Sequence, residues 1–377
     1  YNDPTDEALN ITDDNRIRAT LDLLEYLIEN KAKTIVASHM GRPDGKPDPK
    51  FSLVRVAERL SGLLSKSLNR GEVLFAEDCI GPDAAAKADS LEDGQVLLLE
   101  NLRFYPEEKK NDDAFSKQLA GLCDIYVNNA FAVSHRDQAS VTGIPKFAPQ
   151  KAAGFLLEKE VRSYTDSVEN PKRPLVAVIG GAKVSSKLAA LENMLKIVDK
   201  MVIGGAMANT FLKSQGVDTK GSMIESDLLE TADGIIRSAR EKGVEVLLPE
   251  DLVCAEAFEA GAASKPASVN AIPDEWMALD IGPETAKRYA DAVSGAATIV
   301  WNGPMGVFEM DAFMSGTQVV ADAIAGSGAF SIVGGGDTGL AAKKCRVADK
   351  VSYISTGGGA FLHLMEGKQL PGVTALE

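Results

Sequence analysis

The sequence has 377 residues, 45% of them hydrophobic and 25% charged, which is the balance of a globular protein with room for about two domains. Its 40 basic and 54 acidic residues give a formal net charge of -14, which argues against nucleic acid or an anionic membrane as the main partner. The four cysteines lie far apart without a C-x-x-C pair, so we expect reduced thiols in the cytoplasm rather than disulfides or structural zinc.

The first half of the chain alternates short apolar runs with helical patterns. The runs predict strands at residues 33–40, 72–79, 94–102 and 123–131. A helix is expected to begin at Asp13, Asp14 and Asn15, whose side chains suit a helix N-terminus, and to carry Ile17, Leu21, Leu24 and Ile28 along one face. No run approaches the ~20 apolar residues of a membrane helix. The chain opens on Tyr1 without a secretory leader, and we expect an upstream segment.

The second half predicts strands at residues 174–181, 200–207, 244–253, 297–304, 330–337 and 350–358. Most are near-continuous apolar runs, which are typical of parallel strands buried on both faces. Alternating strands and helices predict an α/β class with two doubly wound, Rossmann-like domains. We place these domains at 1–153 and 174–362, with a hinge helix and linker at 154–173 and a segment at 363–377 that returns to the first domain. A single large sheet is the alternative.

Glycines gather at five of the six strand ends in the second half. They are Gly180-Gly181, Gly204-Gly205, Gly303, Gly334-Gly335-Gly336 and Gly357-Gly358-Gly359. Tight turns and close packing would explain any one of these loops. Ligands of doubly wound sheets bind at the carboxyl ends of the strands, where glycine lets backbone N–H groups approach an anion. Five such loops on one edge therefore predict a phosphate-binding site.

The run of residues 334–339, GGGDTG, also satisfies the dinucleotide fingerprint G-x-G-x-x-G. A dehydrogenase needs a carboxylate at the end of the next strand, but that strand ends at Ser355-Thr356. A Walker A loop is absent. Asp337 follows the glycines at an expected helix N-terminus, where it would either hold Mg²⁺ against nucleotide phosphates or serve as an N-cap.

Two lysines follow the first glycine loop. Lys183 and Lys187 are four residues apart and are expected on one face of the opening helix turn. They would either neutralise a transferring phosphoryl group or form a solvated helix surface.

Several cationic residues of the first half lie in or beside short polar or glycine-bearing segments, and all but the first follow expected strand ends: Arg16, His39, Arg42, Arg103 and Arg136. A single arginine is usually a surface residue, but this set in an acidic protein predicts a pocket for a small polyanion. No nucleophile and base are arranged in the sequence. A carboxylate acceptor needs no base because it is already ionised, so we predict phosphoryl transfer between a nucleotide and a carboxylate-bearing anion.

These motifs resemble the phosphoglycerate kinase family over nearly the whole chain. The resemblance rests on ITDDNRIRA, ASHMGRP, LLENLRF, GGAKVSSK, LDIGPET, VWNGPMGVFE, GGGDT, STGGGA and LPGVTAL, in that order. It implies a hinge-closing monomeric enzyme of the cytoplasm that interconverts 1,3-bisphosphoglycerate plus ADP with 3-phosphoglycerate plus ATP, using Mg²⁺. It implies no membrane and no nucleic-acid partner.

The resemblance also implies residue roles. Phosphoglycerate would contact Asn2, Arg16, His39, Arg42, Arg103 and Arg136, with Arg16 also facing the reacting carboxyl phosphate. Lys183 would stabilise the phosphoryl group in transfer, close to Thr356, Gly357 and Gly358, the last of which is predicted to be catalytic. The nucleotide would contact Gly181, Lys187, Gly205, Leu279 (base), Asn302 (phosphates), Glu309 (ribose hydroxyls), Gly335, Gly336 and Thr338, and Asp337 would bind the metal.

The chain departs from the family pattern at three places. The family's first strand ends in Arg-Val-Asp-(Phe or Tyr)-Asn, whereas this sequence starts at Tyr1-Asn2. Asn129 replaces the usual Asp, and Asp137 and Gln138 stand where Ala and His are common. Two other functions remain open: a dehydrogenase built on the glycine fingerprint, and a non-catalytic relative that binds Mg-nucleotide without transferring phosphate.

Overall fold

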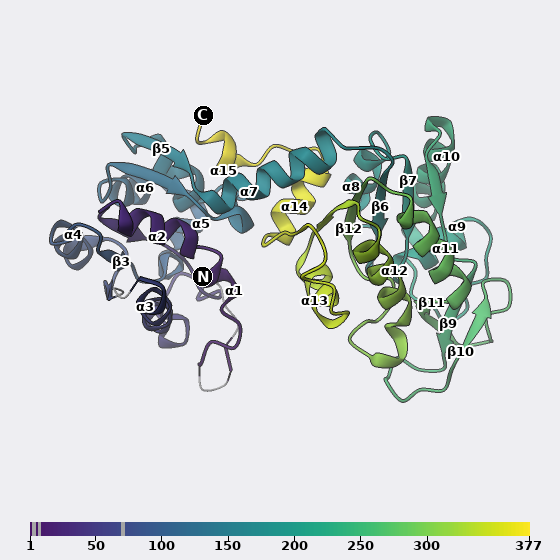
Figure 1. Ribbon diagram of the computed structural model, residues 1–377. Helices are drawn as coiled ribbons and strands as arrows, with labels where there is room; N and C mark the ends of the chain where they lie inside the picture. The colour runs from purple at the N-terminus through teal and green to yellow at the C-terminus, as the bar shows by residue number, and fades with distance from the viewer. Residues whose placement is uncertain (2–4, 7–8, 69–71) are drawn as a thin grey trace. The chain divides into compact units, whose positions relative to one another are not determined.

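A computed structural model describes residues 1, 5–6, 9–68 and 72–377 of the chain. These form two compact units, and Figure 1 labels most of their helices and several of their strands. Unit 1 comprises Tyr1–Glu160 and Gln369–Glu377, and unit 2 comprises Val161–Lys368. The described strands form four separate sheets, most of them parallel, so the α/β prediction is confirmed and the alternative of one large sheet is wrong. The domain boundaries given above stay a prediction.

Unit 1 alternates strands and helices along the chain. Its elements are α1 (Asn15–Arg18), α2 (Leu21–Glu29), β1 (Thr34–Val36), η1 (Pro49–Phe51), α3 (Val54–Leu68), β2 (Val73–Phe75), α4 (Gly81–Asp89), β3 (Val96–Leu98), η2 (Leu102–Phe104), α5 (Pro106–Lys110), α6 (Asp113–Ala120), β4 (Ile125–Asn128), η3 (Phe131–Val133), η4 (Ala139–Gly143), η5 (Ile144–Lys146), β5 (Gln150–Ala153), α7 (Phe155–Tyr164) and α15 (Pro371–Thr374).

The parallel sheet of unit 1 has the strand order β1-β3-β2, with β3 in the centre. Residues of β3 point alternately to two apolar clusters: Val96 and Leu98 pack with α2 and α3, and Leu97 packs with α4 and α6. All four predicted strands of the first half are present. A fifth strand, β5, pairs in parallel with β4 but was not predicted, because its residues Gln150–Ala153 are exposed and carry no apolar signal.

The first predicted helix is interrupted. Residues Ala19 and Thr20 form a turn between α1 and α2, and the Thr20 hydroxyl donates to the Ile17 carbonyl oxygen at 2.8 Å. A hydroxyl that bonds to a backbone carbonyl in this way competes with the helix. The apolar face is nevertheless confirmed: Ile17, Leu24 and Ile28 are buried, and Leu21 is half-buried.

Unit 2 contains the elements η6 (Thr165–Glu169), β6 (Leu175–Ile179), α8 (Leu188–Met194), β7 (Lys200–Ile203), α9 (Met207–Ser214), η7 (Ser226–Leu228), α10 (Leu229–Lys242), β8 (Glu245–Leu247), β9 (Asp251–Ala255), β10 (Ser264–Ser268), β11 (Met277–Ile281), α11 (Pro283–Ser294), β12 (Thr298–Asn302), η8 (Asp311–Phe313), α12 (Ser315–Gly326), β13 (Phe330–Val333), α13 (Gly336–Lys344), β14 (Tyr353–Ile354) and α14 (Gly358–Met365). The last turns of α7 also belong to it.

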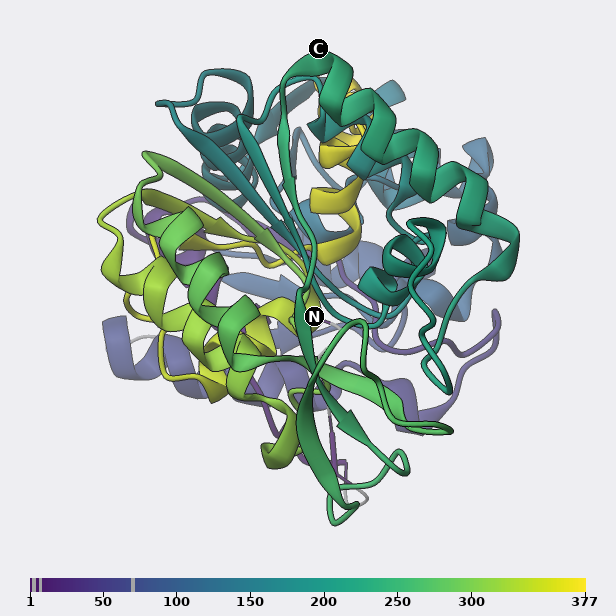
Figure 2. The ribbon, with the colours of Figure 1, turned by 90° about the vertical axis from the view of Figure 1, so that its right-hand side faces the viewer.

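Six parallel strands form the main sheet of unit 2, in the order β14-β13-β12-β6-β7-β8. All five residues of β6 are buried, as the continuous apolar run predicted. Val176 and Val178 pack in one apolar cluster with residues of α11, α12 and α13. Figure 2 shows helices on both faces of the sheet, with α11 and α12 on one face and α10 on the other.

The predicted strand at 244–253 is wrong, because it is two strands in different sheets. β8 ends at Leu247, before Pro249, which cannot donate to a strand ladder. β9 then starts at Asp251 in a separate antiparallel sheet of order β10-β9-β11. Sequence periodicity did not indicate this sheet, because the five residues of β10 are mostly exposed.

The C-terminal residues of unit 1 attach to its second sheet. The Asn128 side-chain amide donates to the Gly372 carbonyl at 3.0 Å, and the Lys151 ammonium donates to the Ala375 carbonyl at 2.9 Å. These bonds join α15 to β4 and β5. Across the described ranges of the chain, no helix combines the length and apolar character needed to span a membrane.

Candidate active site

Four of the five predicted cationic residues of unit 1 follow the carboxyl ends of strands, directly or after a short helical turn. His39 and Arg42 follow β1, and Arg103 lies in η2 after β3, the neighbour of β1. Arg136 follows η3, whose Val133 carbonyl accepts its backbone N–H at 2.9 Å. Arg16 is an exposed residue of α1. Asn2 lies outside the described residues.

These side chains influence one another electrostatically. The pKa of His39 falls to about 2, first because the imidazole is buried and then because of positive charges that include Arg103, Arg136 and Arg16. Burial, followed by the charges of Arg136 and Arg42, also lowers the pKa of Arg103. His39 thus lies within electrostatic reach of Arg16, Arg103 and Arg136, and Arg103 lies within reach of Arg136 and Arg42, so these interactions connect the five predicted cations of unit 1. We call them the arginine cluster.

Arg103 is the buried member of the arginine cluster, with 5% of its surface exposed. One terminal guanidinium nitrogen donates to the Gly41 carbonyl at 2.9 Å, while its Nε is buried with no hydrogen-bond partner among the described residues. The buried carboxylate of Glu108 balances part of its charge. A buried donor without a partner costs free energy, and an anionic ligand at this point would satisfy it.

Two neighbours of Arg103 in the chain fix the loops of the arginine cluster. The Asn101 amide donates to the Met40 and Phe51 carbonyls, each at 2.8 Å, and its oxygen accepts the Arg103 backbone N–H at 3.0 Å. The Glu100 carboxylate accepts the Leu53 N–H at 2.8 Å. Sequence reasoning missed both residues, although they precede Arg103 in the motif LLENLRF.

Arg18 does not extend the arginine cluster. Its Nε pairs with Asp14 Oδ1 at 2.7 Å, and this bond holds the pKa of Asp14 below its usual value. The carboxylate of Asp14 also binds Arg59, whereas Asp13 accepts the Asn15 N–H at 2.9 Å. Both aspartates were expected to accept backbone N–H groups at the helix start, but Asp13 makes such a bond and Asp14 does not.

The residues that depart from the family pattern hold backbone and loops. Asn129 Oδ1 accepts the Leu156 N–H at 2.8 Å in the first turn of α7. The Asp137 carboxylate accepts the Asn111 amide at 2.7 Å and also the Thr142 hydroxyl. Gln138 is 9% exposed. Asp137 thus stabilises the segment that follows Arg136, and Gln138 is a buried residue of that segment.

In unit 2 the five glycine loops all follow strands of one parallel sheet, and therefore lie on one edge. The chain reverses its direction of progress through the sheet at β6: β7 and β8 lie on one side of it, and β12 lies on the other. Ligands of doubly wound sheets bind at such a switch point. Lys183 and Lys187 lie in the loop after β6, and Asn302 is the last residue of β12.

The glycines of this edge serve two purposes. A Cβ on Gly205 would lie 2.5 Å from the backbone of Gly181, and one on Gly358 would lie 2.8 Å from the Cα of Gly335. Close packing, which was the alternative explanation, therefore accounts for some of them. Gly336 instead has nothing within 4 Å of a Cβ position, which leaves its backbone open to a ligand.

Lys183 and Lys187 do not share a helix face, because α8 begins only at Leu188. This prediction was wrong. Lys187 lies under the loops, where its Nζ donates to the Gly180 carbonyl at 2.6 Å and to the Asn302 carbonyl at 2.7 Å. Burial lowers the pKa of Lys187 to about 8, while the charge of Asp337 opposes this effect. Lys187 thus joins the two loops at the switch point.

Lys183 is exposed in the loop after β6. Glu225 fixes this loop by accepting hydrogen bonds from the Ser185 N–H at 3.0 Å and the Ser185 hydroxyl. Partial burial opposes the shift, but these bonds and the charge of Lys183 lower the pKa of Glu225. Sequence reasoning missed this contact, which joins residues 40 positions apart.

Asp337 lies in the first turn of α13, whose N-cap is Gly335. The N-cap alternative for Asp337 is therefore wrong. Its side chain is exposed, and its charge acts on Lys187. In the part of the chain that the structure describes, no three His, Cys, Asp or Glu side chains are grouped to hold a metal ion. Mg²⁺ in nucleotide sites needs only one or two carboxylates beside the phosphates, which Asp337 fits.

Two polar side chains tie the last glycine loops together. The Thr338 hydroxyl accepts the Gly303 N–H at 2.7 Å, and the Asn302 amide donates to the Gly334 carbonyl at 3.1 Å. Both side chains are buried. They connect the end of β12 to the start of α13.

Leu279 and Glu309 are the residues predicted to contact the nucleotide base and ribose, and they lie in β11 and in the segment of residues 303–314. Leu279, in β11, is 7% exposed and packs with Ala255 and Phe313. Its carbonyl accepts the Val307 N–H at 2.9 Å from the segment of residues 303–314, which carries Glu309. Glu309 itself is exposed.

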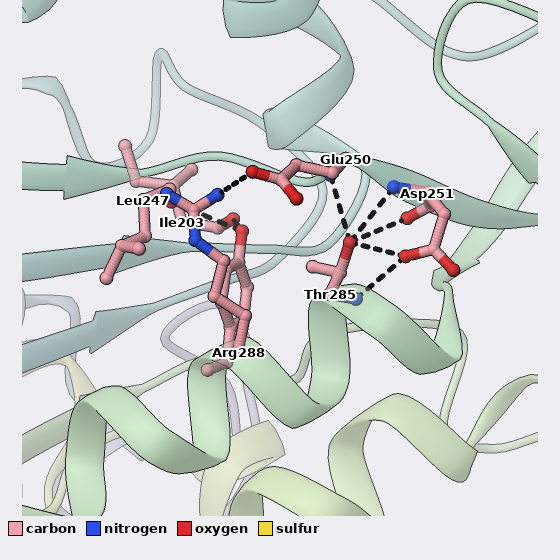
Figure 3. Close-up of polar contacts among 7 residues, drawn as sticks. Ile203, Leu247, Glu250, Asp251, Thr285 and Arg288 are labelled. Atoms are coloured by element: carbon pink, nitrogen blue, oxygen red, sulfur yellow. Dashed lines mark hydrogen bonds and ion pairs between the residues drawn. The ribbon is translucent and has the colours of Figure 1, made fainter.

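A polar network fixes the start of β9 to α11 (Figure 3). The Thr285 hydroxyl donates to the Asp251 carboxylate at 2.6 Å and accepts the backbone N–H groups of Glu250 and Asp251. Arg288, one turn further along α11, pairs with Glu250. The sheet that contains Leu279 is thereby attached to the helix.

The next residue of α11, Tyr289, completes this attachment. Its hydroxyl donates to the Ile203 carbonyl at 2.7 Å and lies 3.2 Å from the Leu247 carbonyl. Ile203 and Leu247 are the last residues of β7 and β8. The carboxyl edge of the parallel sheet and the sheet that carries Leu279 are therefore held in one arrangement.

The fold and these residues define a class: a two-unit α/β protein with a glycine-rich parallel-sheet edge in one unit and a cationic cluster in the other. The sequence model of the family described as phosphoglycerate kinase matches residues 1–368. The chain belongs to the phosphoglycerate kinase family.

Proteins with high sequence identity to this chain are named phosphoglycerate kinase. The phosphoglycerate kinase of Desulforapulum autotrophicum is 61% identical over 377 residues, covering 100% of this chain and 95% of that protein. That of Desulfosudis oleivorans is 54% identical, with 100% and 94% covered. The structure of phosphoglycerate kinase from Coxiella burnetii matches with a TM-score of 0.89 at 42% identity, covering 100% of this chain and 93% of that one. The dehydrogenase alternative is not favoured: β14 is followed by Ser355 and Thr356, with no carboxylate for a ribose.

Proposed function

We propose that the protein transfers the acyl phosphate of 1,3-bisphosphoglycerate to Mg-ADP, giving 3-phosphoglycerate and ATP, reversibly. The observation that carries this proposal is the pairing of two anion-binding arrangements in one chain of this family. Unit 1 supplies the arginine cluster, and unit 2 supplies the glycine-loop edge with Lys183, Lys187 and Asp337.

The phosphoglycerate is bound by the arginine cluster and Asn2 in this proposal. Arg103 offers a buried guanidinium with a free Nε for a bidentate contact, and His39 stays neutral near pH 7 because its pKa is about 2. A neutral imidazole can donate one hydrogen bond to an anion without further raising the local charge. Arg16 is assigned to the carboxyl phosphate that reacts.

The nucleotide is bound at the carboxyl edge of the unit 2 sheet. Gly181, Gly205, Gly335 and Gly336 line the phosphates with Asn302, Thr338 and Lys187. Leu279 contacts the base, and Glu309 contacts the ribose hydroxyls. Asp337 would hold Mg²⁺, which supplies charge neutralisation at the nucleotide phosphates when bound.

Phosphoryl transfer in this proposal is in-line and follows hinge closure. The acceptor or leaving group is a carboxylate, which is ionised near neutral pH, so no general base is needed. Lys183 and Arg16 stabilise the charge on the phosphoryl group, and Gly358 offers its N–H at the start of α14. Such a reaction depends mainly on positioning and charge stabilisation.

The remaining proposals concern the location, oligomeric state and partners of the protein. We propose a cytoplasmic monomer that acts on these small molecules and not on nucleic acid. Support for a reducing compartment comes from its cysteines, since Cys79, Cys123, Cys254 and Cys345 are all free thiols.

The test is ATP-dependent phosphorylation of 3-phosphoglycerate with Mg²⁺, followed through coupled NADH oxidation. We expect turnover in the parent protein, a loss of at least about 100-fold in kcat for Lys183→Ala, and no loss for Lys287→Ala, a control on the exposed surface of α11. Binding of Mg-ADP should persist in Lys183→Ala. A parent protein that binds Mg-ADP without turnover would support the non-catalytic alternative instead.

A further inference from the structure

Lys344, the last residue of α13, makes three contacts with one segment of the chain. Its Nζ lies 2.9 Å from the Phe308 carbonyl oxygen, 3.0 Å from the Glu309 carbonyl oxygen and 2.7 Å from the Asp311 carboxylate. An ammonium group has three N–H donors. All three can therefore be directed at residues 308–311, on either side of the Glu309 side chain.

The same helix also fixes the start of that segment. Thr338, in the first turn of α13, accepts the Gly303 N–H at 2.7 Å. Residues 338 and 344 are six positions apart, which is about 9 Å along a helix. One rigid helix thus anchors residues 303–314 at two points. Its first turn carries Asp337, the proposed metal ligand.

A lysine near a helix C-terminus is often explained by the helix dipole alone. Lys343, its neighbour, occupies the same last turn and would share that benefit. The dipole does not explain why the Lys344 ammonium also bonds to two carbonyls and a carboxylate outside the helix. These contacts point to a role in shaping the segment that presents Glu309.

We propose that Lys344 is a positioning residue for nucleotide recognition: it fixes the backbone of Glu309 so that this carboxylate meets the ribose hydroxyls. The inference rests on the proposed function, which assigns the ribose to Glu309. The Glu309 side chain is exposed, so among the residues that the structure describes its direction depends chiefly on the backbone that carries it. Loss of the Lys344 contacts would leave the carboxylate with the same charge but without a fixed direction.

The experiment compares ADP with 2′-deoxy-ADP by titration calorimetry, with Mg²⁺ present and no turnover. The parent protein should bind ADP at least about tenfold more tightly than 2′-deoxy-ADP, as expected for a lost hydrogen bond to a charged group. Lys344→Met should reduce this ratio to about twofold or less, mainly by weakening ADP. Lys343→Met is the matched control, and its ratio should equal that of the parent.

A double-mutant cycle with Glu309→Gln sharpens the comparison. If Lys344 acts through Glu309, the two changes should be non-additive, and Lys344→Met should have little further effect in a Glu309→Gln background. A role limited to helix stability would lower the unfolding temperature but leave the ADP to 2′-deoxy-ADP ratio unchanged. That unchanged ratio would overturn the inference.

If Lys344→Met does not fold, Lys344→Gln and Asp311→Asn carry the same test. Asp311 is 89% exposed, so its substitution removes one of the three contacts without disturbing the core. The ratio should fall partway, and a ratio equal to that of the parent in both variants would refute the role of Lys344. Failure of the parent to bind ADP at all would instead refute the proposed function.

Discussion

Replacing Lys187 by methionine separates the contribution of this lysine to folding stability from its contribution to nucleotide binding. Its Nζ donates to the Gly180 and Asn302 carbonyls at 2.6 and 2.7 Å. Hydrogen bonds to charged groups contribute about 1.5–3 kcal/mol each. Against this, the fall of the Lys187 pKa from 10.5 to about 8 corresponds to a penalty on the order of 3 kcal/mol for holding the charge there. The net loss of stability in Lys187→Met should therefore be small, roughly 0–3 kcal/mol.

The effect on the nucleotide should be larger. Two of the three ammonium donors bind loop carbonyls, and the third remains for a phosphate oxygen. Loss of that charged contact should weaken ADP binding about 10- to 150-fold. In the parent protein, ADP affinity should also fall as pH rises above about 8, because the lowered pKa means that the ammonium loses its proton there. Lys187→Met should lack this component.

Calorimetric titration of ADP between pH 6.5 and 9.5, together with urea unfolding, measures both quantities. Lys287→Met, on the exposed surface of α11, is the control. Between pH 8 and 10.5 the unfolded parent binds the Lys187 proton more tightly than the folded parent, so parental stability should rise with pH relative to the variant. A change in ADP affinity of less than about twofold, or a loss of more than about 4 kcal/mol in the free energy of unfolding of Lys187→Met, would refute this account of Lys187.

Three further predictions follow from other residues. Arg103→Lys keeps the positive charge but loses the planar guanidinium fork. Calorimetry should show 3-phosphoglycerate binding weakened at least about tenfold, while ADP binding stays within about twofold of the parent. Equal losses for both ligands would contradict this prediction. Burial raises the pKa of Asp280 from 3.8 to about 7, so the folded state holds a proton that the unfolded state has lost, and stability should fall as pH rises through that window. Asp280→Asn should therefore gain about 2 kcal/mol over the parent between pH 5 and 7 in urea unfolding, and parallel curves would refute it. Asn129→Asp places a negative charge at the Leu156 N–H in the first turn of α7 and should stabilise the protein by about 0.3–1 kcal/mol, which unfolding at low and high salt would test.

Much of the fold could be predicted because its strands are apolar on both faces. The runs at 94–102, 174–181 and 297–304 each contain a fully buried strand, and such continuous apolar runs are typical of parallel strands buried on both faces. The predictions failed where a strand has no regular pattern of apolar residues in the sequence. β5 and β10 are exposed, and the long run at 244–253 hid a break at Pro249.

The residues of the candidate site could likewise be predicted only in part from the sequence. Glycines and arginines at strand ends were visible because they follow apolar runs directly. Lys183 and Lys187 were wrongly placed on a helix, because a spacing of four residues indicates a shared face only where the helix has already begun. Glu225 and Lys344 could not be recognised from the sequence, since their partners lie 33 to 40 positions away.

The division of the chain has a consequence for the order in which the protein can be made. Unit 2 is one continuous stretch, Val161–Lys368, whereas unit 1 is built from two stretches that flank it. On the ribosome, unit 2 can therefore be synthesised whole before Gln369–Glu377 exists. The bonds from Asn128 to Gly372 and from Lys151 to Ala375 can form only afterwards, so unit 1, although synthesised first, is the last to be completed.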